Sequence, residues 1–240
     1  MLELWFHFLF LYLTVLLPFG AWRRMARGSR PPAGAPPDPR RPTTARIYLG
    51  VIVSHWVVAG AVVFVFWRTG IPLAALGLAA PHAGPLAACA LALAAGWFVW
   101  VHYQGRALAD PVKVARLRAR FDRMSLLIPS TAAEERAWIL VSITAGVCEE
   151  LLYRGFVGFY LGRWMPLWAV ALAGSLIFGI AHLYQGPKNA LRTALIGALH
   201  WALYLQTGSI LPGMVLHAAL DIRSGTVLKR VFTNPAPAAA

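Results

Sequence analysis

Two adjacent glutamates and an arginine interrupt an apolar stretch of the chain, AGVCEELLYRGF (145–156). Ionisable side chains are costly in hydrocarbon and persist mainly where they face a cavity or one another. On an α-helix, neighbours point about 100° apart, so Glu149 and Glu150 diverge, whereas Glu150 and Arg154 share a face. The spacing predicts a Glu150–Arg154 ion pair and leaves Glu149 as a candidate general base. The alternative is a structural polar clamp made by all three residues.

Later apolar stretches carry three further groups that could meet Glu149. His182 follows Phe178 by four residues, and His217 precedes Asp221 by four, so each pair shares a helix face. Glu149 with His182 could deprotonate a water that attacks a peptide carbonyl. His217 and Asp221 would then orient the site or stabilise the developing oxyanion.

A metal offers a second chemistry for the same groups. Two histidines and two carboxylates (His182, His217, Glu149 and Asp221) could bind zinc and activate its water. Because the chain contains no His-Glu-x-x-His motif, this alternative depends on ligand type alone. From these residues alone, both chemistries remain open.

The other histidines and both cysteines are interpreted as packing or connecting residues. A Cys148 nucleophile is disfavoured, because apolar surroundings and the adjacent carboxylate both oppose formation of a thiolate. The residues interpreted in this way are His55, His102 and His200 within helices, His7 and His82 near helix ends or in a loop, and Cys89 and Cys148 in apolar stretches.

The composition indicates a membrane protein. Hydrophobic residues make up 59% of the 240-residue chain and charged residues 13%, against about 25% charged in soluble domains. The apolar stretches predict an all-α transmembrane bundle of seven or eight spans with an interfacial amphipathic helix. The seven expected spans are 2–19, 47–67, 85–103, 138–161, 166–184, 190–205 and 210–228, with 71–80 and 106–123 at the interface.

Three regions are expected along the chain. Residues 1–130 hold the N-terminal spans, a Pro- and Arg-rich loop (23–46) and the amphipathic connector. Residues 131–228 hold the candidate catalytic residues Glu149, His182, His217 and Asp221, and 229–240 is expected to be a disordered tail.

Positive charge is distributed unevenly among the connections. Of the 22 Lys and Arg residues, 19 lie in alternate connections and only Arg68 and Arg163 in the others. This asymmetry predicts an outside amino terminus and a cytoplasmic carboxyl terminus. The net charge of +13 is therefore attributed to topology and to anionic lipid at the basic loops, and a nucleic-acid partner is not expected.

The assembled motifs resemble the CAAX protease and bacteriocin-processing (CPBP, or ABI) family of intramembrane endopeptidases. The resemblance covers roughly 130–223. The family signature has three parts: Glu-Glu-x-x-x-Arg (Glu149, Glu150, Arg154), Phe-x-x-x-His (Phe178, His182) and His-x-x-x-Asn/Asp (His217, Asp221).

The resemblance implies a membrane endopeptidase acting on a membrane-tethered protein or peptide. Glu149 and His182 would activate water, and His217 and Asp221 would hold the oxyanion. Of the two chemistries, the metal-free glutamate mechanism without a cofactor is preferred, with zinc as the alternative. The resemblance implies Asn at the last position in members that act on prenylated proteins, whereas this chain has Asp221. An aspartate that is not protonated cannot donate a hydrogen bond. Asp221 could therefore orient His217 instead. Glu150, Arg154 and Phe178 would support the site.

Alternatives from other classes remain at this point. They are a non-catalytic membrane scaffold, a bacteriocin-immunity protein and a proton-coupled transporter. The Ala-, Arg- and Pro-rich composition is typical of a bacterial protein, which places the expected protein in the inner membrane and argues against a prenylated substrate.

Overall fold

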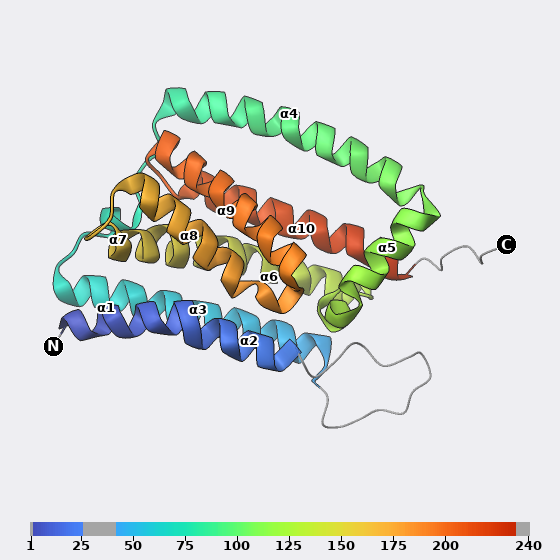
Figure 1. The fold of residues 1–240 in the computed structure, drawn as a ribbon, viewed down its shortest axis with the longest axis horizontal. Helices are drawn as coiled ribbons and strands as arrows, with labels where there is room; N and C mark the ends of the chain where they lie inside the picture. Colours follow the sequence, from blue (N-terminus) through green and yellow to red (C-terminus); the bar gives the residue numbers. More distant parts are fainter. Residues whose placement is uncertain (1, 26–41, 234–240) are drawn as a thin grey trace.

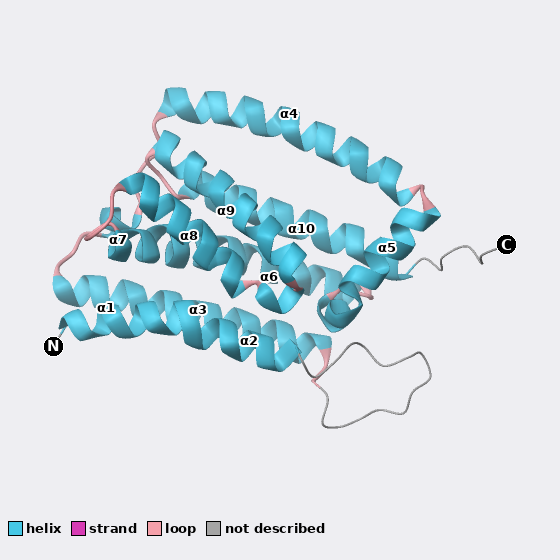
Figure 2. Ribbon diagram, in the orientation of Figure 1, coloured by secondary structure: helices cyan, strands magenta, loops and turns pink. Residues whose placement is uncertain are grey.

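The computed structural model describes residues 2–25 and 42–233, and this part of the chain is helical with no strand (Figures 1 and 2). The all-α prediction is confirmed. The first helical hairpin pairs the N-terminal helix with α3 (Thr44–Thr69). The N-terminal helix consists of α1 (Leu2–Leu11), the π-helical η1 (Tyr12–Leu16) and α2 (Leu17–Met25).

A short 3₁₀ segment, η2 (Leu73–Leu76), leads to α4 (Ala83–Leu108). None of the α4 residues is buried, and large apolar side chains such as Leu91 and Phe98 are exposed. Figure 1 shows α4 running along the outside of the bundle. An apolar helix without a protein-buried face is suited to contact with lipid.

The basic connector forms α5 (Pro111–Phe121) and the 3₁₀ segment η3 (Asp122–Leu127). It begins five residues later than expected, because 106–108 completes α4 and Asp110 caps α5 through the backbone N–H groups of Lys113 and Val112. These hydrogen bonds, that of Lys113 first, hold the pKa of Asp110 below its usual value.

The C-terminal half contains the remaining helices. A capping box at Thr131 and Glu134 starts α6. α10 packs closely along α6 at Gly146 of α6, where an added Cβ would lie 2.7 Å from the carbonyl oxygen of Met214 in α10. Only small residues permit such an approach of two helices. The elements are α6 (Ala132–Glu149), π-helical η4 (Glu150–Val157), α7 (Gly158–Leu161), α8 (Leu167–Ala181), 3₁₀ η5 (Leu183–Gln185), α9 (Pro187–Thr207) and α10 (Leu211–Thr233).

One expectation about the elements is not confirmed, and another needs correction. Within the described residues, three helices are long and apolar enough to cross a membrane: Glu3–Arg23, Thr44–Thr69 and Ala83–Leu108. The count of about seven spans is not confirmed, because α8 is short and charged residues interrupt the apolar character of the α6–α7 segment. Residues 229–233 belong to α10 and not to a tail. The rest of the tail (234–240) and most of the Pro- and Arg-rich loop (26–41) lie outside the described residues.

Candidate active site

The expected ion pair between Glu150 and Arg154 is present in the interior of the bundle. Nη1 of Arg154 donates to Oε1 of Glu150 at 3.0 Å, and each side chain is 1% exposed. Arg154 also donates to the carbonyl oxygen of Gly197, and its guanidinium lies 4.3 Å from the ring centre of Phe178. This part of the prediction is confirmed.

The local backbone differs from the expected α-helix. The helix changes to π-helical geometry at Glu150 and keeps it to Val157, directly after Glu149. Such segments are rare and are often found at functional sites, because they redirect the side chains that follow. Nothing in the apolar pattern of the sequence indicated this change.

Glu149 is the point on which histidines from three helices converge. Its Oε2 lies 3.8 Å from Nε2 of His182, at the end of α8, and 3.8 Å from Nε2 of His217, on α10. Its Oε1 lies 3.0 Å from Nε2 of His55, on α3. Among the described residues Oε2 has no hydrogen-bond partner, although it is buried. A buried carboxylate oxygen without a partner is open to a water molecule or substrate.

The rings of His182 and His55 are each oriented by a hydrogen bond at Nδ1, the nitrogen that faces away from Glu149. Nδ1 of His182 lies 2.8 Å from the carbonyl oxygen of Phe178, and Nδ1 of His55 lies 2.8 Å from that of Val51. A carbonyl oxygen only accepts, so each Nδ1 donates its hydrogen there. Both rings therefore direct Nε2 at Glu149.

His217 connects the two glutamates and the last predicted residue. Its Nδ1 lies 2.9 Å from Oε1 of Glu150, and its Nε2 lies 3.8 Å from Oδ2 of Asp221 as well as from Glu149. Asp221 is the most accessible of these groups, with its side chain 37% exposed. Its backbone carbonyl accepts a hydrogen bond from the indole of Trp138 on α6, which ties this part of α10 to α6.

All four residues expected to do the chemistry thus lie in one cluster. Glu149 contacts His182 and His217 directly, and Asp221 reaches it through His217. Phe178 is buried against the rings of His182 and His217, with ring centres 4.6 and 5.9 Å away.

Two histidines interpreted as packing residues belong to this cluster, which is a correction. His55 bonds Glu149, and the buried His200 lies 3.9 Å from Oε1 of Glu150 through Nε2. The sequence could have marked both histidines as candidates, because an ionisable residue inside an apolar helix is a functional candidate by default. Their partners were not predictable, since the sequence does not give the register of α3 and α9 against α6.

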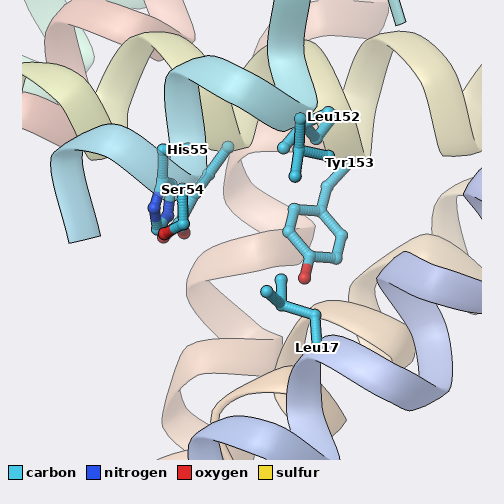
Figure 3. Close-up of a pocket in the computed structure, with 7 residues that line it drawn as sticks. Leu17, Ser54, His55, Leu152 and Tyr153 are labelled. Carbon is cyan, nitrogen blue, oxygen red and sulfur yellow. The ribbon is translucent and has the colours of Figure 1, made fainter. Parts of the chain in front are cut away.

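A small cavity of about 30 Å³ borders Glu149, enough space for a water molecule. His55 and Ser54 of α3 lie on one side of it, and Tyr153 and Leu17 on the other (Figure 3). The cavity is otherwise lined by the apolar side chains of Val58 and Leu152.

One group of potential metal ligands lies beside the glutamates. The described residues able to hold a metal ion together are Glu150, His200 and His217, each with a ligand atom within 4.8 Å of the others. This set differs from the expected ligands. Oε1 of Glu150 already accepts from Arg154 and contacts Nδ1 of His217, so a dication would face a guanidinium at close range. The guanidinium at Glu150 argues against a dication at this particular set.

Residues 134–223, which contain all three motifs, match the family model described as Type II CAAX prenyl endopeptidase Rce1-like. This segment is Rce1-like. The resemblance expected from the sequence is confirmed, and the family implies a membrane protease. Neither a curated protein nor a solved structure matches the chain. The Rce1-like segment extends from α6 into α10, so the whole of α3, with His55, lies outside it.

Proposed function

We propose that this protein is an intramembrane endopeptidase that hydrolyses a peptide bond in a membrane-tethered protein or peptide. The observation that carries this proposal is the partnerless Oε2 of Glu149, which faces Nε2 of both His182 and His217 at 3.8 Å. Together with the Rce1-like match, this arrangement favours hydrolysis over a scaffold, because a structural clamp would be expected to satisfy its buried oxygens.

Glu149 and His182 activate water in this proposal. Their 3.8 Å separation is too long for a direct hydrogen bond and suits a bridging water. Oε2 of Glu149 takes one proton from that water, and the remaining hydroxide attacks the carbonyl carbon of the substrate. The tetrahedral intermediate collapses with cleavage of the C–N bond, and the proton passes from Glu149 to the leaving nitrogen.

His217 and Asp221 stabilise the negative oxygen of the intermediate. Nδ1 of His217 donates to Glu150, while Nε2 faces Glu149 and Asp221. Three surrounding carboxylates favour an imidazolium, whose Nε2–H can then donate to the oxyanion. Asp221 contributes by holding this ring, because an ionised carboxylate cannot donate.

Charge balance supports these protonation states. Glu149, Glu150 and Asp221 carry three negative charges within the cluster, against one permanent positive charge on Arg154. Uncompensated charge inside a membrane bundle is costly. Positive charge on His55 and His217, each in contact with a glutamate, restores the balance.

The composition leads us to assign this multi-pass protein to a bacterial inner membrane, and the basic residues of α5 suggest its orientation. α5 presents Lys113, Arg116 and Arg120 outward, and Arg123 of η3 is also exposed, while Leu117 is half-buried. This pattern is suited to the surface of an anionic leaflet. The C-terminal end of α10 lies against α5 through a bond from Arg118 to the carbonyl of Phe232. Both are therefore assigned to the cytoplasmic face, with the amino terminus outside.

The test uses membrane-tethered peptides of random sequence, each joined to a polyleucine helix and reconstituted with the protein in liposomes. Mass spectrometry reads the cleavage products of the wild type and of Glu149→Gln, which keeps the size of the side chain. We expect cleavage by the wild type and none by the variant. In cells that carry Glu149→Gln, an uncut membrane precursor should accumulate. Equal processing by both proteins would exclude Glu149 as the base.

A further inference from the structure

His55 makes the shortest contact of Glu149 with any histidine. Its Nε2 lies 3.0 Å from Oε1, whereas His182 and His217 lie 3.8 Å from Oε2. His55 lies near the middle of α3 and outside the Rce1-like segment. It also lines the cavity beside Glu149 (Figure 3). A residue of the N-terminal half thus reaches the central carboxylate.

Both ring nitrogens of His55 face oxygen acceptors. Nδ1 lies 2.8 Å from the carbonyl oxygen of Val51, which can only accept, so Nδ1 carries a hydrogen. In a neutral ring Nε2 would then be bare, and at 3.0 Å it would oppose the lone pairs of an ionised Glu149. The contact is favourable only if a proton lies within it.

The two glutamates are then neutralised in the same way by different partners. Glu150 has Arg154 on its own helix at 3.0 Å, and Glu149 has His55 on α3 at 3.0 Å. The His55 bond holds Oε1, which leaves Oε2 turned toward His182. Fixing the base in this way lowers the cost of reaching the reactive arrangement.

We propose that His55 is a positioning residue, which donates an Nε2–H to Oε1 of Glu149 and so fixes Oε2 for the activation of water. This inference rests on the proposed function for its effect on catalysis. The hydrogen bond itself does not depend on that function and can be measured without any substrate.

The first experiment observes the proton. Protein containing ¹⁵N-labelled histidine is placed in lipid nanodiscs, and the His55 ring signals are identified by their loss in His55→Gln. We expect a protonated Nε2 in the wild type that becomes unprotonated in Glu149→Gln, while Nδ1 stays protonated in both. An unprotonated Nε2 in the wild type, or one unaffected by Glu149→Gln, would overturn the proposal.

The second experiment measures its catalytic effect with the tethered peptides in liposomes. We expect His55→Leu to lower kcat by roughly ten- to a hundredfold with little change in KM. His55→Gln, which can still donate to Oε1, should recover a large part of kcat. A merely structural role would give equal losses in both variants and no rescue.

Trp56→Phe is the matched control, because the Trp56 indole bonds Thr144 across the same pair of helices, α3 and α6. It should leave kcat and the His55 signals unchanged. If Glu149→Gln is inactive and His55→Leu is normal, the inference about His55 fails and the proposed function stands. If Glu149→Gln cleaves as well as the wild type, the proposed function fails, and the nitrogen signals still decide whether His55 donates to Glu149.

Discussion

Nδ1 of His217 lies 2.9 Å from Oε1 of Glu150, the same oxygen that accepts from Arg154 at 3.0 Å. Glu150 therefore supports the site in two ways: it neutralises a buried arginine, and it fixes the ring whose other nitrogen faces Glu149. The sequence analysis gave Glu150 a supporting role and paired it with Arg154, but it did not predict the contact with His217.

Replacing Glu150 by Gln should strongly destabilise the protein. Removing one member of a buried ion pair leaves an uncompensated charge and costs about 3–5 kcal/mol. Unfolding in mixed detergent micelles, followed by circular dichroism, measures the change. Glu135→Gln is the control, because it breaks a more exposed pair with Lys229 at 2.6 Å and should cost less than about 1 kcal/mol. Similar losses for the two variants would contradict the assigned role of Glu150.

Asp221 should tolerate Asn better than Ala. The Asn side chain keeps an oxygen near Nε2 of His217, now 3.8 Å from Oδ2 of Asp221, and its amide can donate to the oxyanion. We expect Asp221→Asn to stay within about tenfold of the wild-type kcat. Asp221→Ala should lose roughly a hundredfold, because His217 is then no longer held as the donor to the oxyanion. Cleavage of tethered peptides in liposomes gives both values. Normal turnover by Asp221→Ala would remove this residue from the site.

Chelators should leave the activity unchanged. In the set formed by Glu150, His200 and His217, Oε1 of Glu150 already accepts from Arg154, and no step of the proposed reaction needs a metal. Activity after prolonged treatment with 1,10-phenanthroline, together with elemental analysis of the purified protein, checks this expectation. Loss of activity that zinc restores would support the metal-dependent alternative.

Gly146→Ala should disturb the contact between the two helices that carry Glu149 and His217. The added Cβ would lie 2.7 Å from the carbonyl oxygen of Met214 and 2.9 Å from the backbone nitrogen of Ala218, and overpacking of this kind costs about 1–3 kcal/mol. Gly60→Ala in α3 is the control, because nothing lies within 4 Å of its new Cβ. It should be neutral or slightly stabilising in the same unfolding assay. Equal effects would show that the close approach at Gly146 is unimportant.

The sequence was most informative where the interaction is local. The ion pair between Glu150 and Arg154 joins residues four apart on one helix, and helical spacing alone predicted it. The meeting of His182 and His217 at Glu149 was expected from residue type and from the three motifs in order, because functional groups in apolar helices turn toward a shared interior.

Contacts that depend on helix register could not be predicted in this way. His55 reaches Glu149 across 94 residues of sequence, and only the packing of α3 on α6 brings them together. The π-helical segment from Glu150 to Val157 also leaves no periodic signal in eight residues. The number of membrane spans also stays a prediction, because three of the described helices are long and apolar enough to cross a membrane and the remaining expected spans do not meet both conditions.

Cleavage by Glu149→Gln is the measurement that tests the central claim most directly. Wild type and variant are compared in liposomes that contain the tethered random peptides, with retention of fold checked by circular dichroism. Loss of a general base should reduce turnover by about 10²–10⁴-fold, although the variant stays folded and still contains His182. Turnover by folded Glu149→Gln at the wild-type rate would contradict the account.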